Sequence, residues 1–432
     1  MNNIPVKNSK KSYWFTIETY THISLKKDSL LLYNTLTGDL LEYSQSQHPE
    51  VFHLIRRLLS TKTLQVIRLS DREIQKPGIS LFLKEMKDRF MGELINGSYS
   101  KGKPIQFPPR VRINRDIKKL KDQPYRSVGE RVMKYLSEIT FYITDRCDQN
   151  CSMCRSAYRQ FKCCTSSKGK PHELTLENFK QVLDQTKSAP LNKLHILGGN
   201  IFSYSRFAEL TRTLSESRTK IMFYTHYKCI PTKGKNAGIE MLPSNSSITV
   251  LVSLPVHEEQ LAMAYRNIKE SCIEYRFVFI IENEDDYLKA ERVIESLQIP
   301  NAEFQPFYNT RNLEFFKENV FVRKEDIPES KPGLKEIFAS QVINRVDFGA
   351  LTILSNGHIH SNTNTSRLGI LGTNTIYEAL CIEMIKGDSW LKTRMNILPC
   401  KHCTFQALCS PVTNYNRVIG RNDTCFQYNK NS

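Results

Sequence analysis

The chain has 432 residues, of which 40% are hydrophobic and 24% are charged, so it can bury a sizeable core and form about two to four domains. This composition excludes an intrinsically disordered chain. The amino-terminal residues are polar and carry lysines, and no apolar run approaches the roughly 18 residues that a membrane helix needs. We therefore expect no signal peptide, no membrane span and a cytoplasmic location.

The formal net charge of +17 raises the question of nucleic-acid binding. The lysines and arginines are spread along the whole chain, however, and the dense stretch 101–131 lacks an aromatic stacking pattern. A solvated basic surface, or a docking surface for an acidic peptide, is therefore preferred to nucleic acid. Twelve cysteines without a secretion signal indicate metal or redox chemistry in a reducing compartment rather than disulfides.

The first region, residues 12–100, has the size of a small domain. Alternating apolar residues predict strands, and apolar residues at helical spacing predict helices. The expected strands are 14–20, 22–25 and a hairpin over 30–43 that turns at 34–39, and the expected helices are 51–59 and 81–94. The next stretch, 101–131, is rich in Lys, Arg and Pro and is expected to form a linker or an extended strap.

From residue 139 onward the pattern alternates between strands and helices, which indicates a parallel sheet. Strands are expected at 139–143, 193–197, 220–224, 247–254, 275–281 and 303–307, and helices at 174–187, 206–217, 258–270 and 285–297. Six strands are too few for a closed eight-stranded barrel, so the expected fold class is α/β with an open, partial barrel. No helix is visible between the third and fourth strands.

The region after the sixth strand is less regular. Residues 308–345 show no clear pattern. The stretch 350–360 predicts a hairpin that turns at Asn356 and Gly357, and a helix is expected around 376–384.

Three cysteines, Cys147, Cys151 and Cys154, follow the first strand of the predicted sheet with spacings of three and two residues. Three thiolates on one loop can hold three corners of a four-iron, four-sulfur (4Fe–4S) cluster and leave one iron open, as a catalytic site requires. The loop also lies at the carboxyl end of a strand, where parallel α/β folds place their chemistry. A chance cluster or a zinc knuckle is the alternative.

Two further features could belong to a site. Gly198 and Gly199 end the second strand, where glycine lets a ligand approach the backbone, although a simple turn would use glycine too. A second set of four cysteines suits either an iron–sulfur cluster or a zinc ion, with iron–sulfur preferred. This set consists of Cys400, Cys403, Cys409 and Cys425.

Cys163 and Cys164 follow the first cysteine set, where a free surface loop is preferred to a labile pair that supports the cluster. Cys229, Cys272 and Cys381 lack partners at ligand spacing and are expected to be small core residues. His195 stands in an apolar strand, so we expect a core histidine whose hydrogen bonds are satisfied. Tyr224 and His226, at the end of the third strand, are candidates to line a pocket.

The loop 147–154 resembles the signature of radical S-adenosylmethionine (radical SAM) enzymes. In that family the methionyl group binds the open iron, and reductive cleavage gives a 5′-deoxyadenosyl radical. The resemblance implies that Cys147, Cys151 and Cys154 are the catalytic cluster ligands. It also implies cofactor-binding positions, namely Gly198, Gly199 and Asn200, where the family has a Gly-Gly-Glu-Pro-like motif, and Met153, where the family usually has an aromatic residue near the adenine.

The carboxyl-terminal region is similar to a SPASM-type auxiliary-cluster domain in reduced form. Its usual seven cysteines are not all present, because the sequence has 360–362 as His-Ser-Asn where one is expected, and Thr413 near the place of another. The resemblance therefore implies a single auxiliary 4Fe–4S cluster, closed to substrate and held by the second cysteine set. Its role would be structural or electron-relaying.

The amino-terminal region resembles the winged-helix-like module with which peptide-modifying radical SAM enzymes bind the leader of a precursor peptide by strand addition. The segment 25–43, together with 307–312 and the 348–357 hairpin, resembles maturases of the Bacteroidales-type double-glycine-leader peptide systems. That group includes pseudo members without cluster cysteines, whereas this chain keeps all three.

These features predict a radical SAM peptide maturase. It would comprise a leader-recognition module at 12–100, a linker at 101–131, a partial (β/α)6 barrel at 132–310 and a reduced SPASM-like domain at 346–432. Its cofactors would be S-adenosylmethionine and the two clusters, and its partners a precursor peptide and an electron donor such as flavodoxin or ferredoxin. One alternative is a catalytically inactive protein that presents the precursor peptide to a second maturase. Another is a zinc-containing nucleic-acid-binding protein.

Overall fold

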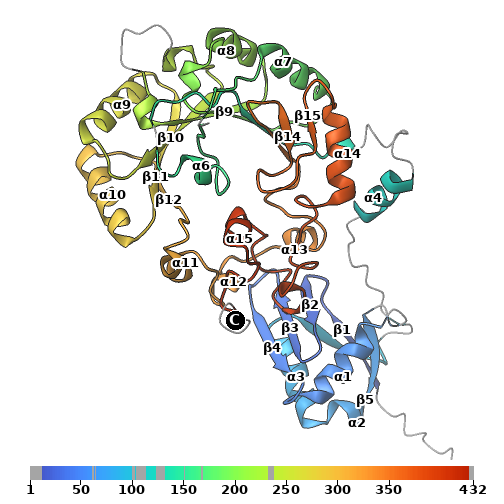
Figure 1. Ribbon diagram of the computed structural model, residues 1–432. Helices are drawn as coiled ribbons and strands as arrows, with labels where there is room; N and C mark the ends of the chain where they lie inside the picture. The colour runs from blue at the N-terminus through green and yellow to red at the C-terminus, as the bar shows by residue number, and fades with distance from the viewer. Residues whose placement is uncertain are drawn as a thin grey trace, which may run out of the picture.

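The computed structural model describes residues 12–60, 63, 65–99, 103, 113–122, 132–149, 151–166, 169–231 and 238–427 (Figure 1). Its strands form two small antiparallel sheets near the amino terminus and one large, mostly parallel sheet. No helix in the part of the chain just defined is long and apolar enough to cross a membrane.

The amino-terminal module contains two three-stranded sheets, with the orders β5-β1-β6 and β2-β3-β4, and three helices. Its elements are β1 (Ser12–Ile17), β2 (Thr21–Leu25), β3 (Ser29–Asn34), β4 (Leu40–Ser44), α1 (Pro49–Leu58), β5 (Val66–Ser70), α2 (Asp71–Ile74), α3 (Pro77–Asp88) and β6 (Gly92–Asn96). One apolar cluster, which includes Phe15, Phe52 and Phe82, holds the sheets and helices together.

Most of the elements predicted for this module are confirmed. The hairpin over 30–43 is β3 and β4, whose turn contains Gly38 at a φ of +84°. The helix predicted at 81–94 is wrong in its second half, because α3 ends at Asp88 and 92–96 pair with β1 as strand β6. A long-range strand partner outweighs local helical periodicity here. Whether the module is winged-helix-like stays a prediction.

The large sheet has the order β12-β11-β10-β9-β8-β7-β13-β14-β15. Its first six strands in chain order are parallel and confirm all six predicted strands: β7 (Glu138–Tyr142), β8 (Lys193–Leu197), β9 (Lys220–His226), β10 (Ser246–Ser253), β11 (Glu274–Ile281) and β12 (Ala302–Pro306). Figure 1 shows them as an open arc.

The predicted hairpin near residue 350 joins this same sheet, which the sequence did not indicate. Strand β13 (Ala350–Ile353) runs parallel to β7, and β14 (His358–His360) and β15 (Gly369–Ile370) follow antiparallel. Gly357 turns the hairpin with a φ of +80°. The carboxyl-terminal region therefore extends the large sheet beyond β7.

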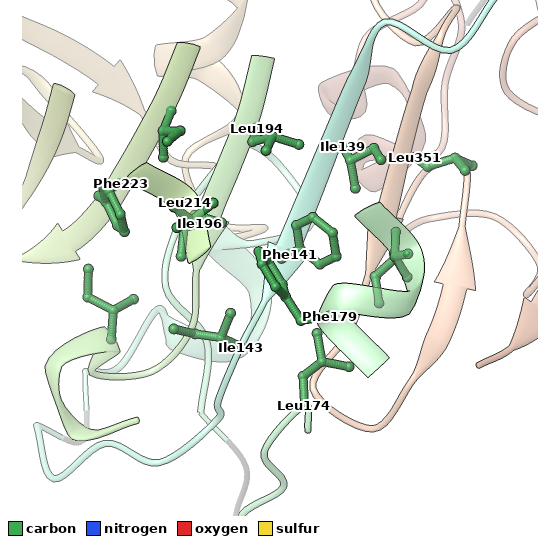
Figure 2. Close-up of a cluster of buried hydrophobic side chains, with 14 of the residues drawn as sticks. Ile139, Phe141, Ile143, Leu174, Phe179, Leu194, Ile196, Leu214, Phe223 and Leu351 are labelled. Carbon is green, nitrogen blue, oxygen red and sulfur yellow. The ribbon is translucent and has the colours of Figure 1, made fainter. Parts of the chain in front are cut away.

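Helices cover the outer face of the sheet, and apolar residues at alternate strand positions face them. The helices are α7 (Leu176–Gln185), α8 (Phe207–Ser215), α9 (Glu258–Glu270), α10 (Glu284–Leu297) and α14 (Ile376–Lys386). Figure 2 shows Ile139 and Phe141 of β7 beside Phe179 of α7. The opposite positions, such as Glu138 and Tyr142, therefore face the inside of the arc.

The four helices predicted between the parallel strands are confirmed, and their starts differ from the predicted ones by two residues at most. The Thr175 hydroxyl caps α7 by accepting from the Asn178 amide at 3.1 Å, and Asn283 caps α10. Between β9 and β10, the described residues form two 3₁₀ turns, η2 (Tyr227–Cys229) and η3 (Ile239–Met241), rather than an α-helix.

Two regions without a clear sequence pattern contain helices. The predicted linker includes α4 (Ile113–Asp122), whose Ile113 and Leu120 join the main core. The stretch after β12 forms α11 (Leu313–Asn319), α12 (Asp326–Glu329) and α13 (Leu334–Ser340). The segments around the two cysteine sets contain α6 (Cys154–Ala157), η4 (Cys400–His402) and α15 (Asn414–Ile419), and η1 (Ile201–Ser203) follows the glycine pair.

Candidate functional site

The carboxyl ends of β7, β8 and β9 bring together three segments that are distant in sequence. The cysteine loop follows β7, the glycine pair follows β8 and η2 follows β9, and these strands are neighbours in the sheet. Because parallel strands end at the same edge, Cys147, Gly199 and Cys229 lie close together there. Asn150 of the cysteine loop is outside the described residues.

The glycine pair is required by the approach of the cysteine loop itself. The Gly199 amide donates to the Thr144 carbonyl at 2.7 Å, and the Asn200 amide donates to the Arg146 carbonyl at 2.7 Å. A Cβ atom on Gly199 would lie 2.3 Å from the Arg146 oxygen and 2.9 Å from the Cys147 Cβ. Packing of the chain therefore explains these glycines without a ligand, and their role in cofactor binding stays a prediction.

Two polar groups of the same turn already have partners within the chain. The Gly198 carbonyl accepts from the Thr165 amide at 3.0 Å, and the Asn200 side chain accepts from the Phe202 amide at 3.1 Å. Asn200 thus caps the 3₁₀ turn η1. A cofactor bound here would have to share or replace these contacts.

The three loop thiols are surrounded by other thiols. A hydrogen bond from the Cys229 thiol lowers the pKa of Cys147 below that of an ordinary thiol. Cys154 lies 3.4 Å from the Ser166 hydroxyl, and a hydrogen bond with the Cys164 thiol, together with burial, raises its pKa. Burial also raises the pKa of Cys151.

Three of these neighbours were not assigned to the site from the sequence. Cys163 and Cys164 are 2% and 5% exposed, so the prediction of a free surface loop is wrong. Cys229 is buried as predicted, but its partner is Cys147. Its place three residues after β9 was the available signal, because β9 ends at the same sheet edge as β7. Of the other two, Cys381 is a core residue as predicted, whereas Cys272 is exposed, contrary to prediction.

The segment that follows the cysteine loop packs into the arc of the sheet. Met153 and Ala157 form an apolar cluster with Leu251 of β10 and with Val278 and Ile280 of β11. Figure 1 shows α6 on the concave side of the arc. This packing places an apolar wall beside the loop thiols.

Side-chain hydrogen bonds fix this segment from two sides. The Gln160 amide donates to the Tyr308 carbonyl and accepts from the Tyr308 amide, both at 2.8 Å. Asn364, beyond β14, donates to the Arg159 carbonyl at 2.7 Å. The end of β12 and the carboxyl-terminal region therefore both hold the segment in place.

A hydrogen-bonded chain crosses the inner face of β7, β8 and β9. His195 Nδ1 lies 3.1 Å from the Tyr224 hydroxyl, and Nε2 lies 3.2 Å from Glu138. Burial lowers the pKa of His195 to about 4, and the hydrogen bond from His195 lowers that of Glu138 to about 2. At neutral pH, Nε2 therefore carries the proton and donates to the Glu138 carboxylate, while Nδ1 accepts from Tyr224. The predicted core histidine is confirmed.

His226 also faces inward and is buried. Its Nε2 lies 3.0 Å from the Ser253 hydroxyl, and burial lowers its pKa to about 3. Tyr224 packs with Tyr142 in a small cluster that also contacts Tyr158 of the cysteine segment. The two residues proposed to line a pocket thus lie on the concave face of the sheet.

The second cysteine set lines one cavity near the carboxyl terminus. All four thiols border a volume of about 460 Å³, together with Arg394 and with residues of the amino-terminal module. Arg394 is only 4% exposed, and its Nη1 donates to Cys400 Sγ at 3.4 Å and to the Asn422 carbonyl at 2.7 Å. Burial opposes a charged guanidinium, but the thiols of Cys409 and Cys400 raise the pKa of Arg394.

A polar network occupies the place where further auxiliary-cluster cysteines were expected. Asn362 donates to Asp347 at 3.0 Å and to Asn414 at 2.7 Å, and Asp347 forms a buried ion pair with Arg417. Thr413 caps α15. Hydrogen bonds and one ion pair therefore connect these loops.

Within the described ranges, no three His, Cys, Asp or Glu side chains gather closely enough to hold a single metal ion. Both cysteine sets are instead brought to one region each, the first at the sheet edge and the second around its cavity. The assignment of all seven cysteines as metal ligands stays a prediction.

Comparison with known proteins gives distant structural similarity. No family model matches the sequence, and no curated protein matches it. SuiB of Streptococcus suis bound to S-adenosylmethionine aligns over 95% of this chain and 97% of its own, with 14% identity and a TM-score of 0.46. SuiB bound to precursor peptide SuiA aligns over 95% and 98%, with the same identity and score.

A second protein, anSMEcpe with bound AdoMet and Cp18Cys peptide, aligns over 64% of this chain and 88% of its own, with 12% identity and a TM-score of 0.40. Such values establish neither a family nor an activity for this chain.

Proposed function

We propose that this protein is a radical SAM enzyme that modifies a ribosomally made precursor peptide. The observation that carries the proposal is the position of the 147–154 loop. Its three thiols follow β7, the first in chain order of the parallel strands of the large sheet, and lie beside the glycine pair that follows β8. With S-adenosylmethionine, an iron–sulfur cluster held there would supply a 5′-deoxyadenosyl radical that abstracts hydrogen from the peptide.

The residues around the loop suit a thiolate-bound group. Cys147, Cys151 and Cys154 would be its ligands, and the hydrogen bond that lowers the pKa of Cys147 favours the thiolate form that a cluster ligand requires. Gly198, Gly199 and Asn200 would border the cofactor from the β8 side, and Met153 from the apolar wall. Leu251 and Ile280 in that wall would help to exclude water from a reactive intermediate.

The second cysteine set would hold one auxiliary cluster. A zinc ion binds four thiolates at about 2.3 Å, which draws the sulfurs to within about 4 Å of one another. The four thiols here line a cavity of about 460 Å³, which has room for a group larger than one ion. Arg394 supplies a buried positive charge beside them, as a negatively charged thiolate cluster needs. We therefore favour iron–sulfur over zinc at this site.

The amino-terminal module would bind the leader of the precursor peptide. Strands β2 and β4 are the edges of one of its sheets and β5 and β6 of the other, and an extended peptide can pair with such an edge. The net charge of +17 favours an acidic peptide. A flavodoxin or ferredoxin would deliver the electron, which implies a cytoplasmic enzyme.

A catalytically inactive peptide-presenting protein is the second candidate. The hydrogen bonds of the Gly198 carbonyl and the Asn200 side chain favour it, because both groups at the expected cofactor position are already occupied within the chain. Such a protein would bind the precursor peptide and pass it to a second maturase.

Anaerobic reconstitution distinguishes these two functions. An active enzyme should take up about eight irons per chain and release 5′-deoxyadenosine after addition of reductant and S-adenosylmethionine. Cys151→Ala should reduce 5′-deoxyadenosine to background and keep peptide binding, because its thiol would be a cluster ligand. Cys381→Ala, a buried cysteine in the main core, serves as the matched control.

Two outcomes would contradict the enzyme. Undiminished 5′-deoxyadenosine in Cys151→Ala would exclude the proposed ligand set. Iron uptake without cleavage in the wild type, even with precursor peptide present, would favour the peptide-presenting protein.

A further inference from the structure

Strand β3 of the amino-terminal module has one face in the module's own core and the other against the rest of the chain. In β3, Leu30 and Leu32 face the core of the module itself. Leu31 and Tyr33 point the other way and are fully buried in a separate cluster with residues of the carboxyl-terminal region. Strand β3 therefore carries half of a docking interface, which we call the β3 interface.

The other half of the β3 interface is shared between Ile327 and Ile337 of α12 and α13 and the segments between the four cysteines of the second set. Phe405, Ala407 and Leu408 stand between Cys403 and Cys409 and pack in the same cluster as Leu31 and Tyr33. Phe426, next to the fourth cysteine, packs against them. Residues 403–409 form consecutive turns without a strand or an α-helix. Its shape therefore depends on burial and on a few turn hydrogen bonds, such as those from the Leu408 and Cys409 amides to the Phe405 carbonyl at 2.9 Å.

The cavity bordered by the thiols lies at this same junction. Its lining includes Ser29 and Glu42 of the module as well as all four cysteines. Two polar contacts bridge the junction: Lys26 Nζ donates to the Lys401 carbonyl at 2.9 Å, and Glu42 forms an ion pair with Lys324 at 2.7 Å. These contacts are exposed or half-exposed, so each contributes little by itself.

Arg394 connects the segments that present the thiols. Its guanidinium donates to Cys400 Sγ, to the Ser410 carbonyl and to the Asn422 carbonyl. Arg394 therefore ties together three points of the chain around the cavity. The Phe405 and Phe426 rings, whose centroids lie 5.7 Å apart, also join 403–409 to the turn containing Cys425. A group bound by all four thiols would add a covalent connection to this packing.

We infer that the group bound by Cys400, Cys403, Cys409 and Cys425 fixes the β3 interface, so that occupancy of this site determines whether the amino-terminal module is docked. The inference rests on the proposed four-cysteine site but on neither the identity of the metal nor catalysis. A thiolate-bound metal contributes folding free energy to the loops that supply its ligands. Here those loops carry part of the surface that receives Leu31 and Tyr33.

The test uses the full-length protein after anaerobic reconstitution. Small-angle X-ray scattering reports the module's position through the radius of gyration, and hydrogen exchange of 403–409 reports the interface. Cys409→Ala should increase the radius of gyration and speed exchange in 403–409 by about tenfold or more. Cys151→Ala should change neither, although it also removes a proposed cluster ligand.

Two further variants keep the test decisive. Cys425→Ser, a milder loss of the same site, should release the module like Cys409→Ala while circular dichroism shows an intact barrel. Tyr33→Ala, on the opposite side of the interface, should release the module and retain the metal of the second site. A compact Cys409→Ala protein with unchanged exchange would overturn the inference.

Metal analysis separates failure of the inference from failure of the proposed function. A docked module in a wild-type chain that binds no metal at the second site would overturn both the auxiliary site and the inference. Metal present at that site, with docking unaffected by its removal, would overturn the inference alone. Equal release of the module in Cys151→Ala would also overturn it, because the effect would then belong to both sites.

Discussion

The two cysteine regions are built in opposite ways. The first places three thiols on a loop whose ends are fixed by neighbouring strands, with the Gly199 amide bonded to Thr144 and the Asn200 amide to Arg146. The second takes four thiols from turns and a 3₁₀ helix, which Arg394 connects. The first region therefore receives its shape from the sheet, whereas the second depends on the groups at its centre.

The groups that interact electrostatically with the thiols also differ between the two regions. At the sheet edge a thiol, Cys229, stabilises the thiolate of Cys147 by a hydrogen bond. At the second site a buried guanidinium lies against Cys400, and the thiols stabilise its charge in turn. The first arrangement, whose shape comes from the sheet, suits a site that leaves one iron open for a cofactor. The second arrangement suits a closed site that stabilises the loops around it.

The largest effect is expected from removing the buried charge at the second site. Arg394→Gln should destabilise the reconstituted protein by about 3–5 kcal/mol, because buried thiolates lose their counter-charge and two carbonyls lose a donor. Urea unfolding and metal retention at the second site measure this. Arg394→Lys should lose less stability, since it keeps the positive charge. Arg206→Gln, which removes exposed ion pairs to Glu177 and Glu209, should leave the free energy of unfolding nearly unchanged.

A loss below about 1 kcal/mol in Arg394→Gln would show that the second site does not depend on its central charge. The contrast between the two cysteine regions would then be wrong. A loss of the same size in Arg206→Gln would show that the measurement is insensitive to burial.

The sheet was predictable from the sequence because its signals are local. Each of the six parallel strands is a short apolar run between helical periods, and all six are confirmed. The attachment of β13 to β7 was not predictable, because a pairing between residues 138 and 350 leaves no trace in either segment. The second half of the predicted helix at 81–94 failed for the same reason, since β6 owes its form to pairing with β1.

The residues of the candidate site also differ in whether their signal in the sequence is local or depends on long-range contacts. The spacing of Cys147, Cys151 and Cys154 is local and was visible in the sequence. Cys229 reaches Cys147 only because β7, β8 and β9 are adjacent, which the order of parallel strands could have suggested. Arg394 gave no signal at all, because a single arginine among many acquires its role only through burial among thiols.

A pH dependence tests whether the sheet is stable without a bound group. Burial lowers the pKa of His195 from 6.5 to about 4, so the unfolded chain binds this proton more readily than the folded one. The resulting contribution is fully present above pH 6.5 and is lost as the pH falls towards 4. Its upper limit is about 3 kcal/mol. Urea unfolding of metal-free protein between pH 7 and 4.5 measures it.

His195→Gln should flatten this pH dependence but leave a slope of the same sign, because burial also lowers the pKa values of His22 and His226. The exposed His53, replaced in His53→Gln, provides the control. An unchanged slope in His195→Gln would mean that the histidine is not held neutral on the inner face, and that Glu138 is not its hydrogen-bond acceptor.

Adding one methyl group at Gly199 should have the smallest effect on stability, but its effect on iron binding at the first site should be large. Gly199→Ala places a Cβ 2.3 Å from the Arg146 carbonyl oxygen and 2.9 Å from the Cys147 Cβ, so the cysteine loop must shift. The cost should be about 1–3 kcal/mol. Because the sheet rather than bound metal gives this loop its shape, the cost should be equal with and without reconstitution. Iron uptake at the first site should fall while the second site stays filled.

Gly333→Ala, whose added Cβ meets no atom within 4 Å, should change neither the stability nor the iron uptake. If bound metal restored the stability of Gly199→Ala, the loop would be shaped by its ligand after all, and the two cysteine regions would be alike.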